Sequence, residues 1–414
     1  MTRYSTAQRA IRASNLGQVL GVVRRRAPCS RAEVASELGL TRATVSSLVA
    51  ELTSHGLVRE EGTSTTGKVG RPGQMLRLDD RFVAALGVEV NVDYLTLVAV
   101  DLMGGELLHR HVTFDTRSSG PHQTLARLAE VIASGMSEPG LARRRVLGVG
   151  VAVPALVDDA GTVRRAPNLG WSDVPLAAEL RNASGSCSQL AEAPILVHND
   201  ASLAVVAEYR DGHLAGTQDL VYLTGEVGIG AGILRGGHLL QGAHGYAGEI
   251  GHIAMQPDGP RCACGRQGCL EALAGIEAIL RRAVPDRVRT TDPLAARELA
   301  GAVHEAVRRA QSGDADVVAV LDEAGHWLGN AAAHVCNLLD TEAIILGGYF
   351  VPLGPWLLPA ANDRLRSGVF AAQHHDTRIH LSTLGLTAAA RGGASMPVQS
   401  LERGQIPVPA TEPA

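Results

Sequence analysis

The stretch that decides the fold is GEIGHIAMQPDGPRCACGRQGCLE, residues 248–271. It holds four side chains that favour transition metals: His252, Cys262, Cys264 and Cys269. Three thiolates and one imidazole form a closed tetrahedral zinc site, which is structural because no position is left for water. Gly265 and Gly268 let the backbone turn tightly around the ion. The sequence therefore predicts one structural Zn²⁺ per chain, and the missing open position argues against a zinc-dependent hydrolase.

Apolar runs on both sides of this stretch alternate with helical segments and end in glycines or carboxylates. The first series of runs covers 86–90, 95–100, 147–153 and 195–197. The second series covers 220–223, a glycine-rich turn at 228–232, and 343–346. This alternation is typical of a mixed α/β fold whose sites lie on loops. Two similar series predict two related lobes with a cleft between them.

Residues 1–80 carry the pattern of a winged helix-turn-helix domain. A first helix ends near Pro28, Ser30 begins a second with a capping box, and Thr41 begins a third that ends near Ser54. Two strands around a polar loop, with Arg71 in Gly70-Arg71-Pro72, form the wing. The alternative is a three-helix packing module with a solvated polar face. The predicted DNA contacts are Thr41, Arg42, Thr44, Ser46, Ser47 and Arg71.

The charge distribution supports DNA binding by this head. Residues 1–80 hold 12 basic and 7 acidic residues, a net charge of +5, whereas the remainder holds 26 basic and 35 acidic residues, a net charge of −9. A basic head on an acidic body is typical of a DNA-contacting domain fused to a small-molecule domain. Lys68 is the only lysine, which excludes a mechanism that needs a buried catalytic lysine elsewhere in the chain.

Targeting signals are not expected. Arg3, Arg9 and Arg12 interrupt any apolar run near the N-terminus. The uncharged stretch 343–361 contains three prolines, so it cannot form one continuous spanning helix. We therefore expect a cytoplasmic protein without a membrane segment. The proline-containing tail, residues 395–414, is expected to be disordered.

The motifs GEIGH and CACGRQGCLE, in this spacing, resemble those of the ROK family of repressors and sugar kinases. Asn199-Asp200 after a strand, GIGAG at 228–232 and Leu346-Gly347-Gly348 resemble further family motifs in the same order. The resemblance implies an actin-like, two-lobed sugar-kinase domain over residues 81–394 that assembles as a homodimer or homotetramer. It also implies a set of sugar-binding residues: Asn168, Asn199, Asp200, Glu249, His252 and Glu271.

The phosphate loops differ from those of the family's kinases. In the family's kinases the first phosphate loop resembles the pattern D-x-G-G-T. The matching stretch of this chain is Glu89-Val90-Asn91-Val92-Asp93, which lacks the glycine pair. In the second loop Val227 replaces a threonine beside Glu226. Added carboxylates disfavour a polyphosphate. The sequence therefore predicts a regulator, a repressor of carbohydrate-metabolism genes that binds operator DNA and a sugar or sugar phosphate, with no catalytic residue. The alternative is an ATP-dependent sugar kinase with an accessory DNA-binding domain and Asp200 as its base.

Overall fold

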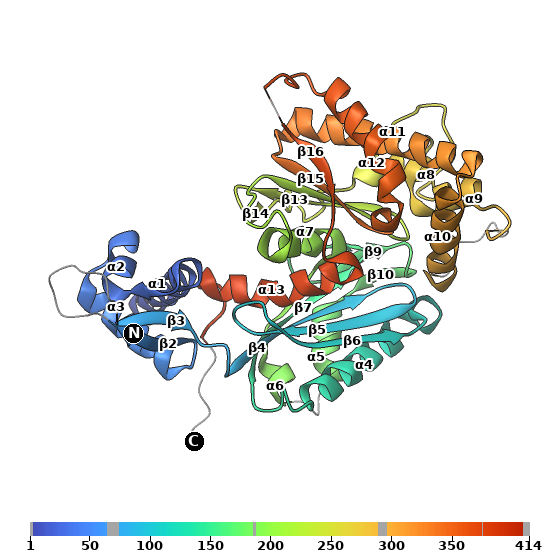
Figure 1. Cartoon of the computed structure of the whole chain (residues 1–414). Coiled ribbons are helices and arrows are strands. Elements are labelled where there is room, and N and C mark those ends of the chain that lie inside the picture. Colours follow the sequence, from blue (N-terminus) through green and yellow to red (C-terminus); the bar gives the residue numbers. More distant parts are fainter. Residues whose placement is uncertain (1–2, 64–73, 185–187, 289–295, 375, 409–414) are drawn as a thin grey trace.

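The computed structural model describes residues 3–63, 74–184, 188–288, 296–374 and 376–408. The head forms three helices and a small sheet in the order β1-β3-β2 (Figure 1). Its elements are α1 (Arg3–Arg26), β1 (Cys29–Ser30), α2 (Arg31–Leu38), α3 (Arg42–Ser54), β2 (Val58–Thr63) and β3 (Gln74–Leu78). The prediction of a winged helix-turn-helix head is confirmed.

Local signals in the sequence determine where the helices of the head begin. The Ser30 hydroxyl and the Glu33 carboxylate form the predicted capping box at α2, and Gly39 ends that helix with a φ of 64°. Thr41 Oγ1 accepts a hydrogen bond from Thr44 N at the start of α3. The first helix is longer than its apolar pattern indicates, because its N-terminal half has few apolar residues from which a buried face could be recognised.

Lobe I is built on a five-stranded sheet in the order β11-β7-β4-β5-β6. β4 pairs antiparallel with β5 and parallel with β7, and its residues are all buried. A small sheet, β10-β9-β8, lies beside it. The elements are β4 (Val83–Val90), β5 (Tyr94–Val100), β6 (Glu106–Thr113), α4 (Thr116–Met136), β7 (Arg145–Val153), β8 (Leu156–Val157), β9 (Val163–Ala166), β10 (Trp171–Val174), α5 (Leu176–Ala183), α6 (Ser188–Glu192) and β11 (Ile195–Asn199).

Lobe II repeats this topology in its own sheet, β14-β13-β12-β15-β16. In each lobe the first strand pairs antiparallel with the second and parallel with the fourth, which confirms the prediction of two related lobes. The strands are β12 (Leu220–Gly225), β13 (Ile229–Arg235), β14 (His238–Leu239), β15 (Ala343–Gly348) and β16 (Arg378–Leu381). The helices are η1 (Ile250–His252), α8 (Leu270–Ala274), α9 (Ile276–Ala283), α10 (Ala296–Gln311), α11 (Ala315–Leu339) and α12 (Phe350–Gly368).

Two helices cross between the sheets, α7 (Asp200–Asp211) and α13 (Ala388–Glu402), with η2 (Gly385–Thr387) leading into the second (Figure 1). They touch through backbone: a Cβ on Gly392 of α13 would lie 1.8 Å from the Leu203 carbonyl oxygen of α7. α13 is equally close to lobe I, since a Cβ on Gly150 of β7 would lie 2.0 Å from the Gly393 carbonyl oxygen. These glycines allow the helices to pack at backbone distance.

The expectation that the tail from residue 395 is disordered is wrong for residues 395–402. They form the end of α13, where Pro397 and Leu401 are buried. Proline is tolerated because the carbonyl of Gly393, which would need the missing N–H, faces Gly150 of β7 instead. Residues 409–414 lie outside the described residues.

One hydrophobic core joins the head to lobe I. Leu20 and Leu48 of the head belong to the same buried cluster as Val83 and Leu147 of lobe I and Leu401 of α13. The domain boundary at residue 80 stays a prediction, because residues on both sides of it share this core. In the described part of the chain, every helix is too short or too polar to span a bilayer. The uncharged stretch 343–361 is divided between β15 and α12.

Candidate metal centre, sugar pocket and DNA-binding face

The four predicted metal ligands form a single cluster. One ligand atom from each of His252, Cys262, Cys264 and Cys269 lies within 4.8 Å of all the others. His252 ends η1, and the cysteines lie on a loop closed by two isolated bridges, Ala254 with Cys269 and Arg261 with Gln267. Gly265 and Gly268 adopt φ values of 92° and 68° in this loop. The positions that needed glycine are therefore those at which the backbone turns around the cluster.

The distances fit a tetrahedral zinc ion. The Sγ atoms of Cys264 and Cys269 lie 3.7 Å apart, and Cys262 Sγ lies 3.8 Å from His252 Nδ1. Sulfur atoms about 2.3 Å from a shared zinc ion, at tetrahedral angles, would be separated by about 3.8 Å. The residues thus have the chemistry of a Cys₃His site, and these two separations match one. A metal ion there would hold the loop together.

Two carboxylates lie next to this cluster. Glu271 Oε2 accepts a hydrogen bond of 3.1 Å from Ile229 N, and its other oxygen lies 3.6 Å from Cys262 Sγ. The predicted residue Asn168 is close: both Glu271 Oε2 and Asn168 Nδ2 lie within 4 Å of the Cβ position of Gly228. Burial raises the pKa of Glu249. The charge of His252 lowers this pKa, and the charge of Glu271 raises it further. The structure therefore brings these predicted sugar ligands together.

Asp200 adds a buried carboxyl to the same group. Only 8% of it is exposed, and its Oδ1 accepts a hydrogen bond of 2.8 Å from Ala201 N. Burial raises the pKa of Asp200 to about 6, and the charge of Glu249 contributes. A carboxyl with a pKa near neutrality can either accept or donate a hydrogen bond to a sugar hydroxyl.

Asn199 has a structural role that the sequence left open. Its Oδ1 accepts a hydrogen bond of 3.1 Å from Ser202 N and caps α7, and its Nδ2 donates to the Ala155 carbonyl. A cavity of about 260 Å³ between the lobes is lined by Asn199, together with Val157 and Asp158 of lobe I and Gln241 of lobe II. A larger cavity of about 590 Å³ lies between α4 and α5, and none of the predicted site residues lines it.

The first phosphate loop is occupied by a buried polar network that sequence reasoning missed. Asn91 Nδ2 donates to Glu89 Oε1 at 3.1 Å, to Tyr94 Oη at 2.8 Å and, across the cleft, to Glu226 Oε2 at 2.6 Å. Tyr94 Oη lies 2.8 Å from Glu89 Oε1 and 3.3 Å from Glu226 Oε2. An amide NH₂ and a phenol carry three hydrogens for these five contacts, so some of the contacts share a hydrogen.

Electrostatics favour a protonated carboxyl in this network. Burial, followed by the charge of Glu226, raises the pKa of Glu89 well above its usual range. Burial, followed by the charge of Asp200, raises the pKa of Glu226. Glu89 Oε2 is buried without a hydrogen-bond partner. This end of the cleft therefore disfavours additional negative charge.

The third helix of the head presents its polar side chains outward. Arg42, Ser46 and Ser47 are exposed, while Val45 and Leu48 on the opposite side of α3 are buried. Thr41 and Thr44 are partly engaged in the helix cap, with their Oγ1 atoms 2.8 Å apart. Arg71 lies outside the described residues.

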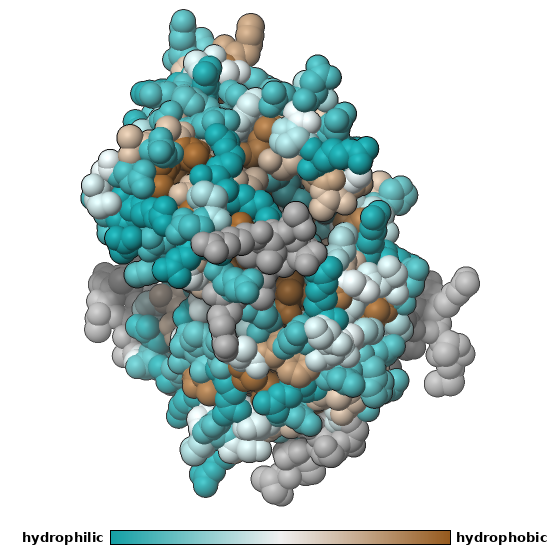
Figure 2. All heavy atoms as spheres, turned by 90° about the vertical axis from the view of Figure 1, so that its right-hand side faces the viewer, coloured by the Kyte–Doolittle hydropathy of each residue, from teal (hydrophilic) through white to brown (hydrophobic). Residues whose placement is uncertain are grey.

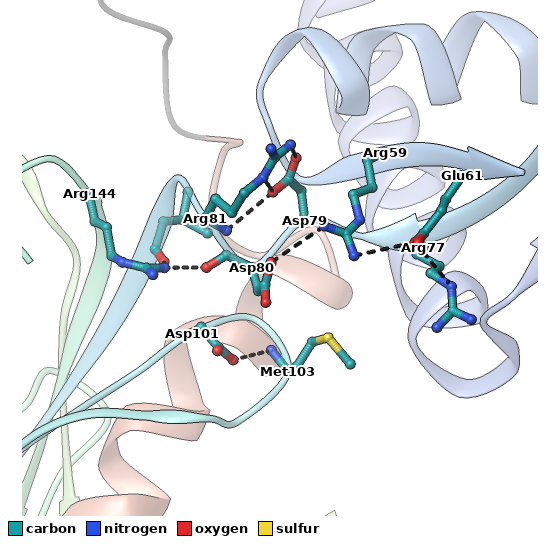
Figure 3. A network of polar contacts seen from close by, with 10 residues as sticks. Arg59, Glu61, Arg77, Asp79, Asp80, Arg81, Asp101, Met103 and Arg144 are labelled. Carbon is teal, nitrogen blue, oxygen red and sulfur yellow. Dashed lines mark hydrogen bonds and ion pairs between the residues drawn. The ribbon is translucent and has the colours of Figure 1, made fainter. Parts of the chain in front are cut away.

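Several arginines near the junction of the head and lobe I pair with neighbouring carboxylates (Figure 3). Arg81 binds Asp79 through Nε and Nη2 at 3.0 and 2.9 Å. Arg59 and Arg77 each lie 3.3 Å from Glu61. The count of 12 basic residues in the head therefore overstates the number of arginines available for phosphate contacts. The face of the lobes remote from the head carries scattered apolar groups among hydrophilic ones (Figure 2).

Comparison with known proteins gives two matches within the chain. The ROK family model matches residues 85–399, and the MarR family model matches residues 17–68. The xylose repressor of Bacillus spizizenii is 26% identical over 392 residues, which cover 95% of this chain and 97% of the repressor.

Two solved structures similar to this chain are a regulator and a kinase. A ROK family transcriptional regulator, a homologue of the Escherichia coli MLC protein, is 27% identical and has a TM-score of 0.78, covering 95% of this chain and 98% of the regulator. A ROK family glucokinase from Streptomyces griseus, in complex with glucose and AMPPNP, is also 27% identical but has a TM-score of 0.60, covering 76% of this chain and 98% of the kinase. Since the family match spans most of the sequence, the chain belongs to the ROK family.

Proposed function

We propose that the protein is a sugar-responsive, DNA-binding transcriptional regulator that represses carbohydrate-metabolism genes in the cytoplasm. The observation that carries this proposal is the exposed polar face of α3, in a head that shares a hydrophobic core with a ROK body. The similarity to a xylose repressor over 95% of the chain, head included, supports it. In a homodimer or homotetramer, two heads would place their third helices in successive major grooves of a palindromic operator.

The proposed effector site is the cluster of polar residues between the lobes. Asn168, Asp200, Glu249 and Glu271 would bind the hydroxyls of a sugar or sugar phosphate, because a polyol needs several convergent acceptors and donors. Asn199 would hold the start of α7 and line the adjoining cavity. A structural Zn²⁺ on the Cys₃His cluster would fix Glu271 through the loop to which it is attached, and His252 would connect the metal to the sugar pocket.

The experiment that tests this function starts from operator selection. Full-length protein selects DNA from a pool of random duplexes, and the affinity of the selected duplex is measured by fluorescence anisotropy. Arg42→Ala is expected to weaken binding at least about 5-fold, because it removes a cationic donor from the groove-facing helix. Arg71→Ala tests the wing in the same assay. Arg127→Ala on α4, remote from the head, is the matched control. Unchanged affinity in both head variants would overturn the proposal.

A second candidate is an ATP-dependent sugar kinase, favoured by one observation. The raised pKa of Asp200, about 6, suits a general base near neutral pH. Incubation with ATP and a panel of aldoses tests it: release of ADP that disappears in Asp200→Asn would support the kinase. We favour the regulator, because Glu89 and Glu226 occupy the region where a kinase would bind phosphates.

A further inference from the structure

A cluster of charges joins helix α1 of the head to the crossing helices α7 and α13. Arg24 of α1 places its Nε 2.7 Å from Glu402 Oε1 on α13. Arg210 of α7 places its Nη1 3.8 Å from Glu402 Oε2. The side chains of Arg210 and Glu402 are 8% and 13% exposed. One carboxylate thus serves two guanidinium groups on two different helices.

The helices that carry these charges belong to different parts of the molecule. α7 packs on lobe II, where a Cβ on Gly232 of β13 would lie 2.1 Å from the Ala201 carbonyl oxygen. α13 packs on lobe I, where a Cβ on Gly87 of β4 would lie 1.8 Å from the Ala390 carbonyl oxygen. A change in the angle between the lobes therefore moves α7 relative to α13.

Helix α1 of the head is attached to the far end of α13. A Cβ on Gly17 would lie 2.4 Å from the Glu402 carbonyl oxygen, and one on Gly404 would lie 2.6 Å from Ser14 Cα. Helix α1 therefore packs at backbone distance on the end of α13. Since Arg12 of α1 also forms an ion pair with Glu51 of α3, a shift of α1 is transmitted to the groove-facing helix.

Helix α7 extends from the proposed sugar pocket to the Glu402 ion pairs. Its first residue is Asp200 of the proposed sugar pocket, its contact with Gly392 of α13 is at Leu203, and Arg210 is one residue from its end. Arg210 lies about 10 Å along the helix from that contact. A small rotation at the contact therefore changes the distance from Arg210 to Glu402 more than it changes the sugar pocket.

The cluster is loosely satisfied in the present arrangement. Arg210 Nη1, Arg24 Nε and Glu402 Oε1 are all buried without a hydrogen-bond partner. Burial, then the charge of Arg24, lowers the pKa of Arg210 to about 10. A buried guanidinium at 3.8 Å from its carboxylate gains from any motion that shortens the contact. The pair therefore favours one lobe arrangement over another.

We propose that Glu402 couples the sugar pocket to the DNA-binding head. As the lobes rotate, its contact with Arg210 of α7 strengthens while its contact with Arg24 of the head weakens, or the reverse. This inference rests on the proposed function, since it requires that sugar changes operator affinity. The ligand acts only through its unequal affinity for the two lobe arrangements. Glu402 touches neither ligand and acts as a positioning residue.

The test measures coupling and not affinity alone. For the wild type and for Glu402→Gln, Arg210→Gln and Arg24→Gln, the operator dissociation constant is measured with and without D-xylose, D-glucose or N-acetylglucosamine. The ratio of the two constants is the coupling factor. Sugar binding without DNA is measured by titration calorimetry. Arg281→Gln, which removes an ion pair to Glu277 within lobe II, is the matched control.

In Glu402→Gln, Arg210→Gln and Arg24→Gln we expect the coupling factor to fall at least about 5-fold toward one, with sugar affinity changed less than about 2-fold. The control should keep the wild-type factor. If the folded variants retain the wild-type factor, the coupling role of Glu402 is overturned while the proposed function stands. If no sugar changes the operator affinity of the wild type, the proposed function itself fails, and the coupling fails with it. Should Glu402→Gln not fold, the two arginine variants decide the question.

Discussion

Asp200→Asn tests the electrostatics of the pocket through protein stability. Burial raises the pKa of Asp200 from 3.8 to about 6 on folding. An acid with a raised pKa holds its proton more tightly in the folded chain than in the unfolded chain, so its ionisation destabilises the fold. The cost is absent below the unfolded pKa, grows as pH rises between the two values, and is constant above the folded one. The wild type should therefore lose stability from this group as pH rises from about 4 to about 6.

The magnitude follows from the difference between the two pKa values. About two units correspond to ~3 kcal/mol at pH 8, falling to ~1 kcal/mol at pH 4.5. Asparagine keeps the Oδ1 that accepts the hydrogen bond from Ala201 N but carries no charge. Asp200→Asn should therefore stabilise the protein by about these amounts. For a chain of this length, the gain at pH 8 raises the melting temperature by about 3 °C.

The assay is calorimetric melting of the full-length chain at pH 4.5 and pH 8. Because the comparison is a difference between variant and wild type, titrating groups that do not interact with Asp200 cancel. Loss of the Asp200 charge also relieves its repulsion of Glu226, which adds to the gain at pH 8. Asp322→Asn on α11, whose side chain is 56% exposed, is the control and should leave the melting temperature nearly unchanged at both pH values. A gain that is equal at the two pH values, or a loss at pH 8, would refute the electrostatic reasoning. Sugar binding, measured separately, should be lost in Asp200→Asn.

Three further predictions concern the head and the metal loop. Leu48→Ala, at a position that is 1% exposed, should destabilise the head by ~2–5 kcal/mol and lower the urea midpoint of operator binding. Thr41→Ala should cost ~1 kcal/mol through the lost helix cap, whereas exposed Ser46→Ala on the same helix should leave stability unchanged in urea titrations followed by circular dichroism. Removal of metal by a chelator, or Cys264→Ser, should lower the melting temperature and sugar affinity together, with metal content checked by mass spectrometry. A metal-free protein that melts and binds sugar normally would contradict a structural role for zinc.

The features predictable from sequence are those encoded within a few residues. The Cys₃His cluster was visible because its ligands share one loop, and Ser30 and Thr41 were visible because caps act over three residues. Asn199 shows the limit of this reasoning: a helix cap and a sugar ligand require the same residue type, and only the hydrogen bond to Ser202 N identifies the cap.

The features that were missed depend on contacts between distant segments. Prolines suggested a disordered tail, but burial of Pro397 against lobe I keeps that segment helical. The network of Asn91 and Glu226 joins residues from different lobes. The shared carboxylate of Glu402 likewise joins three helices that are far apart in the sequence. No local pattern signals such pairs, because their spacing in the chain is arbitrary.

The turn after β4 explains how a kinase-like frame can serve a regulator. In this chain Asn91 of lobe I already reaches Glu226 of lobe II at 2.6 Å, so the lobes are joined by the protein's own side chains. A polyphosphate at this turn would have to displace that contact and face two buried carboxyls whose pKa values are already raised. Each of these carboxyls that is ionised would cost ~1 kcal/mol or more at about 4 Å from a phosphate charge. Because this contact joins the lobes without a nucleotide, sugar is the one ligand required to shift the balance between lobe arrangements. A sensor needs this dependence on a single ligand, whereas a kinase must respond to two.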